Sequence, residues 1–260
     1  MNAEQRQQAI TDAVVRDGRV TVVNLAADHG VTVETIRRDL AALDRVGALR
    51  KVHGGAVAAT RLALPETAVT EREHLAAPAK RAIAAAALSS LLDGGLLAAG
   101  ATLILDAGTS VGALARILPE GLDLTVVTSS VLTAARLAGR RGLTVRVLGG
   151  EVRGITQAAV GPEALAALSR LRVDLAVLGT NGLSADHGLS TPDPDEAAVK
   201  TAMVRAARRV VVLADATKTG QEHLVSFADL SDVDLLVTDI PPTTALSTCL
   251  TGSGTEVLVA

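Results

Sequence analysis

Two adjacent arginines, Arg37 and Arg38, lie in a stretch with the spacing of an amphipathic helix. At roughly 100° per residue, residues 31–45 separate into one apolar side and one polar side. The apolar side contains Val33, Ile36, Leu40 and Leu43. The polar side and its edges contain Glu34, Thr35, Arg37, Arg38 and Arg45. Because a guanidinium group can bond bidentately to guanine or hold a phosphate, this stretch is predicted to be the recognition helix of a helix-turn-helix.

A basic hairpin is predicted to follow this helix. Residues 49–52 are expected to form one strand of a wing, and the chain turns at residues 54–55. The cationic residues of the wing are Arg50, Lys51 and His53. These side chains can contact phosphates or an adjacent minor groove. Thr32 is the expected N-cap of the recognition helix, because its hydroxyl can accept from an amide of the first turn.

A second set of polar residues follows apolar runs farther along the chain. The clusters occupy residues 106–110, 128–130, 149–153, 179–182 and 215–218. If the runs are strands of a parallel sheet, their carboxyl ends share one edge, and ligands bind at that edge. A single Gly or Ser at a strand end is usually a turn residue, but turn chemistry alone does not explain five clusters.

The chemistry of these clusters suits an anionic ligand that carries hydroxyl groups. The amides of residues 108–110 open a predicted helix, whose positive end favours an anion. Hydroxyl donors are Thr109, Ser110, Ser129 and Ser130. Lys218 and Arg153 offer positive charge, although a surface ion pair with Glu151 explains Arg153 equally well. Asp106 can accept from a sugar hydroxyl or cap the next helix.

The elements that must position the arginines are two earlier helices. Residues 3–17 place apolar side chains at helical spacing, and Asp17-Gly18 ends that helix. A short extended piece at residues 19–21 precedes a second helix at residues 23–29, and Gly30 supplies the turn. Gly47 is expected to end the recognition helix.

The elements that must position the polar clusters alternate along the chain. Expected strands are residues 102–105, 124–127, 145–148, 175–178, 210–214 and 235–237. Expected helices are residues 79–92, 111–118, 131–138, 162–169 and 196–207. Most of the apolar runs are rich in Val and Leu at every position, as in strands covered on both faces. The order predicts an α/β unit with a mostly parallel sheet.

The composition sets limits on the class of protein. A chain of 260 residues, 48% of them hydrophobic, suits two domains, and Phe227 is the only aromatic residue. Cys249 is alone, which excludes an intrachain disulfide and fits a reducing cytosol. The polar N-terminus lacks a signal-peptide core, and no charge-free apolar run approaches the ~20 residues of a membrane span. We therefore expect a cytoplasmic protein without a membrane partner.

The distribution of charge is more informative than its total. The net charge is −3, yet residues 37–51 carry five Lys and Arg against two Asp. So modest a patch is expected to need two copies of the module on DNA, which predicts a homo-oligomer. His187 and His223 lack metal-ligand spacing, so neither a metal site nor a cofactor is expected.

Two motifs identify a family resemblance. Residues 35–40, Thr-Ile-Arg-Arg-Asp-Leu, and residues 53–56, His-Gly-Gly-Ala, resemble the N-terminal signature of the DeoR family of bacterial transcription regulators. Glu71-Arg72, followed by residues 80–84, resembles the start of that family's second domain. The polar clusters resemble its sugar-phosphate-sensing domain, which is related in fold to phosphosugar isomerases such as ribose 5-phosphate isomerase.

The resemblance extends from about residue 4 to residue 239 and implies an effector pocket. By the resemblance, its lining is Asp106, Gly108, Thr109, Ser110, Thr128, Ser129, Ser130, Asn181, Asp215 and Lys218. Arg153 is added for its charge. Ser110 stands where the family often has a second Thr, and Ser129 where Asn is common, which leaves the identity of the sugar open.

The expected organisation is a winged helix-turn-helix domain at residues 1–57, a linker at 58–72 and a sugar-phosphate-sensing α/β domain at 73–260. The expected function is that of a DNA-binding regulator of sugar metabolism genes, and a repressor is favoured. A phosphorylated sugar, by family habit a phosphorylated fructose or a related catabolic sugar, is expected to modulate binding to a double-stranded operator. Assembly as a dimer or tetramer is expected.

Two other functions remain open from the residues. In an isomerase-like enzyme acting on phosphosugars, Asp106, Asp215 and Lys218 would serve as acid and base. In a DNA-binding scaffold, the pocket would be unused. Only a regulator explains residues 1–56 together with the pocket, so no catalytic residues are expected.

Overall fold

The computed structural model describes residues 3–45, 49–52, 54–58 and 66–260. The chain divides into two compact units, Met1–Leu64 and Pro65–Ala260. Seven residues of the stretch expected to be a linker, 59–65, lie outside the described residues, as do residue 53 and residues 46–48, which include the expected stop at Gly47.

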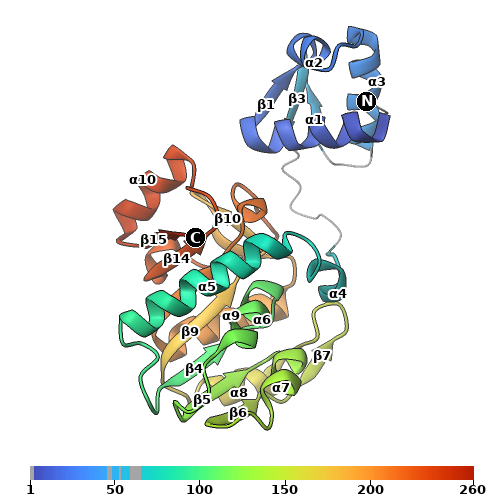
Figure 1. Ribbon diagram of the computed structural model, residues 1–260. Helices are drawn as coiled ribbons and strands as arrows, with labels where there is room; N and C mark the ends of the chain where they lie inside the picture. Colours follow the sequence, from blue (N-terminus) through green and yellow to red (C-terminus); the bar gives the residue numbers. More distant parts are fainter. Residues whose placement is uncertain (1–2, 46–48, 53, 59–65) are drawn as a thin grey trace. The chain divides into compact units, whose positions relative to one another are not determined.

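The N-terminal unit contains three helices and a small antiparallel sheet (Figure 1). The elements are α1 (Ala3–Asp17), β1 (Arg19–Thr21), α2 (Val22–His29), α3 (Val33–Arg45), β2 (Leu49–Val52) and β3 (Gly55–Ala58). The strand order is β1-β3-β2, so β2 and β3 form the expected wing hairpin. A Cβ on Gly55 would lie 1.9 Å from the carbonyl oxygen of Val20, so close pairing of β1 and β3 requires glycine there.

The second unit is built on seven parallel strands in the order β15-β14-β12-β9-β4-β5-β6. Their bounds are β4 (Thr102–Leu105), β5 (Leu124–Thr128), β6 (Leu143–Val147), β9 (Val173–Gly179), β12 (Ala207–Leu213), β14 (Leu235–Thr238) and β15 (Glu256–Val259). Each of the six expected strands overlaps a strand of this sheet. The expected mostly parallel α/β fold is therefore confirmed.

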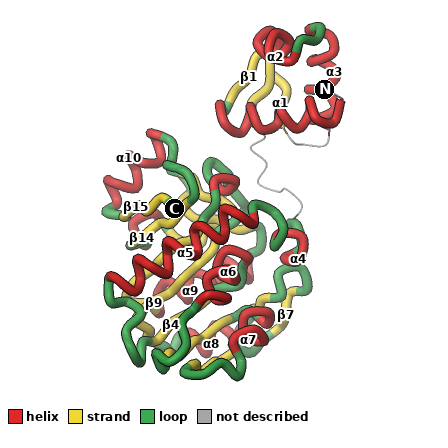
Figure 2. The backbone as a smooth tube through the Cα atoms, in the orientation of Figure 1, coloured by secondary structure: helices red, strands yellow, loops and turns green. Residues whose placement is uncertain are grey.

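Helices cover both faces of the sheet (Figures 1 and 2). One face packs on α5 (Ala77–Asp93), α6 (Thr109–Ile117) and α7 (Val131–Leu137). The other packs on α8 (Pro162–Leu168), α9 (Pro194–Ala206) and α10 (Thr244–Ser253). In β4, Leu103 and Leu105 face the first layer and Ile104 the second, so apolar residues are needed at successive positions. The edge strands β6 and β15 are the exceptions, because Val147 is 56% exposed and Val259 is 43% exposed.

Short elements that the sequence did not indicate complete this unit. They are α4 (Val69–Arg72), β7 (Glu151–Arg153), β8 (Ala158–Val160), β10 (Gly182–Ser184), β11 (Gly188–Thr191), β13 (Val225–Ala228) and two 3-10 turns at Ala216–Lys218 and Leu230–Asp232. β7 pairs with β8, and β10, β11 and β13 form a separate antiparallel sheet. The second half of the expected linker packs on this unit, since Val69 is buried and its amide donates to Ile155 O at 2.8 Å.

The chain order creates a crevice at one edge of the sheet. From β4 the chain moves outward to β5 and β6, then returns to place β9 on the other side of β4. The connections after β4 and β9 therefore diverge at the carboxyl ends of these neighbouring strands. Such a switch point is where open α/β sheets bind ligands.

Candidate functional site

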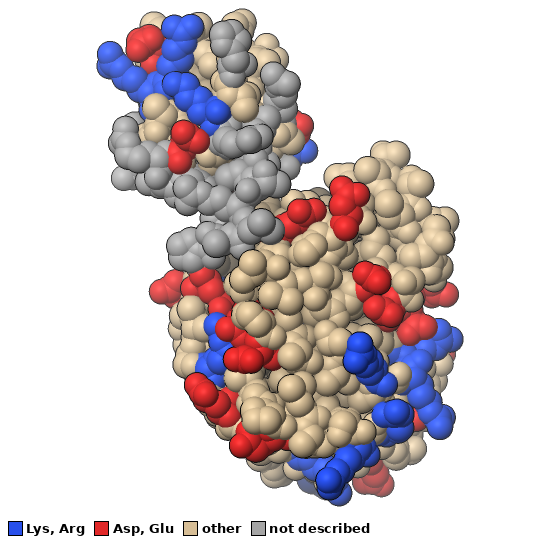
Figure 3. All heavy atoms as spheres, turned by 180° about the vertical axis from the view of Figure 1, so that it is seen from behind, with Lys and Arg blue, Asp and Glu red and all other residues tan. Residues whose placement is uncertain are grey.

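Helix α3 presents its arginines to solvent. Ile36 and Leu40 are fully buried and fix the helix against the rest of the N-terminal unit. The side chains of Arg37 and Arg38 are 59% and 82% exposed. Their guanidinium nitrogens lie 3.6 and 3.9 Å from the carboxylate of Glu34, one turn earlier. Figure 3 shows a group of Lys and Arg side chains on one side of this unit.

One residue of the expected apolar side behaves differently. Val33 is 36% exposed rather than buried, because it is the first residue of α3 and precedes the turn that contacts the core. The expected cap is confirmed, since the amide of Thr35 donates to Thr32 Oγ1 at 3.2 Å. The two hydroxyls of Thr32 and Thr35 lie 2.9 Å apart.

Asp39 connects α3 to α1, a role that the sequence did not reveal. Its carboxylate accepts from Arg6 Nε at 2.6 Å and from Gln7 Nε2 at 2.9 Å. Burial alone would raise the pKa of Asp39, but these hydrogen bonds and the charge of Arg6 lower it. In the motif Arg37-Arg38-Asp39, the carboxylate is thus structural, while both guanidinium groups are exposed to solvent and, among the described residues, pair only with Glu34.

The wing residues are only partly described. Lys51 is exposed, and its amide donates to Asp44 Oδ1 at 3.1 Å, which links the wing to α3. The side chains of Arg45 and Arg50 and the whole of His53 lie outside the described residues. The assignment of these DNA-binding positions stays a prediction.

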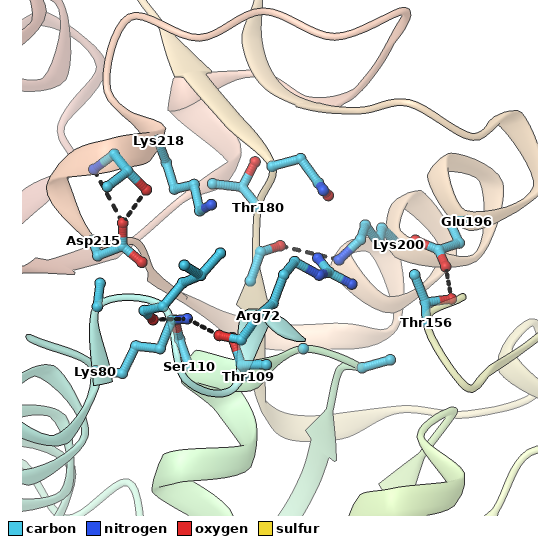
Figure 4. Close-up of a pocket in the computed structure, with 17 residues that line it drawn as sticks. Arg72, Lys80, Thr109, Ser110, Thr156, Thr180, Glu196, Lys200, Asp215 and Lys218 are labelled. Carbon is cyan, nitrogen blue, oxygen red and sulfur yellow. Dashed lines mark hydrogen bonds between the residues drawn. The ribbon is translucent and has the colours of Figure 1, made fainter. Parts of the chain in front are cut away.

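The second unit has a cavity of about 290 Å³ at the carboxyl edge of its sheet, shown in Figure 4. Six of the residues expected at the effector site line it: Gly108, Thr109, Ser110, Asn181, Asp215 and Lys218. They come from the connections after β4, β9 and β12. The cavity therefore lies at the switch point between β4 and β9.

The N-terminus of α6 supplies one wall of this cavity. Gly108 is its N-cap, with φ +154°, and no side chain caps the helix. The first amides of a helix have no partner within the helix, so those of residues 109–111 can donate to an anion. A φ of +154° is open to glycine and strained for other residues, which explains Gly108 at this turn.

Lys218 and Lys80 border the same end of the cavity, and Arg72 reaches into it from that end (Figure 4). Burial lowers the pKa of Lys218, although the nearby carboxylate of Asp215 opposes the shift. Burial also lowers the pKa of Lys80, whose Nζ donates to the carbonyls of Arg72 and Leu75, both at 2.6 Å. Arg72 extends toward the middle of the cavity, and its buried Nε has no hydrogen-bond partner among the described residues. An anion in the cavity would accept hydrogen bonds from these cationic groups.

The opposite side of the cavity is polar but not cationic (Figure 4). Glu196 Oε1 accepts from Thr156 Oγ1 and, at 2.7 Å, from Arg153 Nη1. Lys200 also borders this side, but it is paired with the buried carboxylate of Asp106 and donates to Gly179 O at 3.0 Å. Burial raises the pKa of Asp106 against the pull of Lys200. The pair adds no net charge when both partners are ionised.

Five residues expected at the effector site do not line this cavity. Asp106 lies behind it, bound to Lys200 and to the amide of Gly179 at 3.0 Å. Thr128, Ser129 and Ser130 are buried beyond β5, where Ser130 Oγ accepts from the amide of Thr133 at 3.1 Å and caps α7. Thr128 Oγ1 likewise accepts from the amide of Ser130 at 3.0 Å, and β5 lies one strand away from the switch point.

Arg153 is the fifth. Its guanidinium pairs with three carboxylates, on Glu66 at 2.9 Å, Asp193 at 3.2 Å and Glu196 at 2.7 Å. Burial opposes the shift, but these partners raise the pKa of Arg153. The expected surface pair with Glu151 is absent from the described ion pairs. Arg153 therefore does not line the cavity but holds Glu196, which does.

Several lining residues were missed because they do not follow strands. Arg72 and Lys80 precede the sheet, and their only signal was the pair of basic motifs at 71–72 and 80–81. Glu196 and Lys200 lie on α9, four residues apart on the buried face that also holds Met203. Charged residues at buried helix positions were the signal that would have found them.

Two negative findings apply to the described residues. No group of His, Cys, Asp and Glu side chains among them has the arrangement of a metal site. None of their helices combines the length and apolarity that crossing a bilayer requires.

Comparison with known proteins gives matches over both units. Residues 6–61 match the model of a DeoR-like helix-turn-helix domain, and residues 76–240 match that of the DeoR C terminal sensor domain. The HTH-type transcriptional regulator GlpR of Haloferax volcanii is 37% identical over 91% of this chain and 89% of its own length. The HTH-type transcriptional repressor GlcR of Bacillus subtilis is 32% identical over 100% of this chain and 97% of its own. A ribose 5-phosphate isomerase from Plasmodium falciparum aligns at a TM-score of 0.36, with 14% identity over 55% of this chain and 52% of its own.

Proposed function

This chain belongs to the DeoR family of transcriptional regulators, and we propose that it represses sugar metabolism genes until a phosphorylated sugar occupies the cavity of its second unit. It is a DNA-binding regulator and not an enzyme, since the curated relatives that it resembles over nearly their whole length are regulators or repressors. The alternative of an isomerase-like enzyme is thereby set aside. The effector, the pocket residues and the sign of the response are proposals.

The observation that carries the proposal is the convergence of anion-binding groups in the cavity. The uncapped start of α6 lies with Lys218 and Lys80 around one end, and Arg72 extends from there toward the middle of the cavity. Helix amides, ammonium groups and a guanidinium group are the usual partners of a phosphate dianion. The volume of about 290 Å³ leaves room for more than the phosphate, which favours a phosphate ester over the inorganic ion.

Operator binding is assigned to α3 and the wing. Arg37 and Arg38 would contact phosphates or base edges, and Thr35 would help to set the register of α3 in the major groove. Because one module presents few cations, two copies on two half-sites are proposed, in a homodimer or tetramer located in the cytoplasm. The effector would favour the conformation with weaker DNA affinity, a coupling of typically about 1–3 kcal/mol.

A thermal-shift series tests the effector assignment. Fructose 1-phosphate, fructose 6-phosphate, glucose 6-phosphate and glycerol 3-phosphate are compared with the unphosphorylated compounds. A ligand that binds the native state raises the melting temperature by mass action. We expect at least one phosphate ester to raise it, its unphosphorylated form to have no effect, and Lys218→Ala to abolish the shift. A response to the free sugar, or a full response in Lys218→Ala, would contradict the assignment.

A further inference from the structure

The two ends of the cavity differ in charge. Lys218, Lys80 and the start of α6 lie at one end, and Glu196 and Thr156 lie at the other (Figure 4). At the first end Lys218 and Lys80 lie near the single carboxylate of Asp215, and Arg72 extends from this end toward the middle of the cavity. At the second end the only cation that borders the cavity, among the described residues, is Lys200, and Asp106 pairs with it. The cavity is therefore polarised along its length.

Glu196 retains an unused acceptor. It is 6% exposed and borders the cavity. Within the described part of the chain the hydrogen bonds of its carboxylate all involve Oε1, which accepts from Arg153 and Thr156. Its second oxygen, Oε2, is left for a ligand. An ionised carboxylate only accepts hydrogen bonds, so it repels a phosphate and binds a hydroxyl group.

The position of Glu196 is fixed from behind. Arg153 holds Glu196 with one nitrogen while its others bind Asp193 and Glu66. Asp193 also caps α9, because its Oδ1 accepts from the amide of Glu196 at 2.9 Å. The backbone and the carboxylate of Glu196 are thus both held, as a residue that discriminates between ligands requires.

We infer that Glu196 binds hydroxyl groups at the end of the effector remote from its phosphate, and that it is the residue that separates polyhydroxylated phosphate esters from phosphate itself. The inference rests on the proposed function, since it assumes that the phosphate occupies the end near Lys218. Thr156 is a positioning residue, because its hydroxyl donates to Glu196 Oε1 and so leaves Oε2 available to the ligand.

Isothermal titration calorimetry on the full-length protein tests this inference. The probes are inorganic phosphate and whichever of the four phosphate esters above binds the wild type most tightly. In Glu196→Gln we expect affinity for the ester to fall by about tenfold or more, the size of one lost hydrogen bond to a charged acceptor. Affinity for inorganic phosphate should stay equal or rise, because a negative charge has left the cavity. Thr156→Val should show a smaller loss of the same kind.

The matched control is Glu66→Gln. Glu66 binds the same guanidinium of Arg153 but does not border the cavity. Its substitution should leave the ratio of ester to phosphate affinity within about threefold of the wild type. If Glu196→Gln keeps the wild-type ratio, or if Glu66→Gln lowers it equally, the inference is overturned while the proposed function stands. If no ester binds the wild type, the proposed function itself fails.

Discussion

Lys218 is the residue on which anion binding should depend most. Its ammonium makes no hydrogen bond or ion pair with the described residues, and it points into the cavity. Burial holds its pKa below the ordinary value of 10.5. A buried ammonium group without a hydrogen-bond partner lowers the folding stability, and hydrogen bonds to a bound phosphate would offset that loss. The positive charge of Lys218 therefore favours the binding of an anion in the cavity.

This arrangement predicts proton uptake on binding at alkaline pH. Since the folded-state pKa of Lys218 is lowered, the empty site loses its proton as pH rises through that pKa, and a bound dianion draws the proton back. Affinity for the phosphate ester should therefore begin to fall with rising pH below 10.5. Calorimetry in two buffers of different ionisation enthalpy measures the uptake. In the wild type the uptake should grow as the pH becomes alkaline, whereas an uptake that does not change with pH would contradict this reading.

The exposed arginines predict the salt dependence of DNA binding. Arg38→Ala and Arg37→Ala should each weaken binding to the operator, because each guanidinium group neutralises a phosphate or meets a base edge. For a phosphate contact, the slope of log K against log salt should decrease by about 1. Fluorescence anisotropy at several salt concentrations measures both quantities.

Arg16→Ala is the control for this pair. Arg16 is as exposed as the two arginines of α3, but it lies on α1 and pairs with its neighbour Asp17. Its loss should leave affinity and slope nearly unchanged. If operator affinity falls equally in all three variants, DNA binding depends on net charge alone and not on α3.

At the level of elements, the start of α6 requires glycine at one position, Gly108. Gly108→Ala puts a Cβ on a backbone with φ +154°, so the turn must shift and carry the amides of residues 109–111 with it. We expect ester affinity to fall by at least about tenfold, measured by calorimetry. Gly112→Ala, within the same helix, is the control, since its Cβ would meet only Arg136 Nη1 at 3.6 Å.

The control should behave in the opposite way. Alanine is favoured over glycine within a helix by about 1 kcal/mol, so Gly112→Ala should keep ester affinity and match or raise the melting temperature. A comparable loss of affinity in both variants would mean that any change in α6 disturbs the cavity. The specific role of the helix start would then be wrong.

Long elements were predictable from local patterns, and short ones were not. The strands of the main sheet are continuous apolar runs, because both of their faces are covered. β7, β8 and β10 have three residues each and owe their pairing to partners elsewhere in the chain, which no local periodicity records. β15 and α10 follow the last expected strand and were missed as well.

The site was predictable where it follows a strand beside the switch point. Gly108 and Lys218 lie after β4 and β12, and both were expected at the pocket. The same rule failed for Ser129 and Ser130, because it does not say which strand ends flank the crevice. It also could not supply Glu196, which reaches the cavity from α9 and is placed there by Arg153.

At the scale of the molecule, regulation needs a link between the two units. Segment 66–76 is the first described part of the chain after the N-terminal unit, and it is fixed to the second unit around the cavity. Glu66 pairs with Arg153, Val69 is buried, and Arg72 borders the cavity. A ligand that rearranges these contacts changes the anchoring of the segment that leads to the DNA-binding unit.

The titration of operator DNA with and without the bound ester tests the account most directly. The full-length protein binds a labelled fragment of its own upstream region, and anisotropy gives the affinity with the phosphate ester, with its unphosphorylated form, and with neither. The account predicts that the ester alone weakens operator binding by roughly 5–150-fold, and that Lys218→Ala binds the operator normally but no longer responds. Equal operator affinity in all three conditions, with the ester shown to be bound, would contradict it.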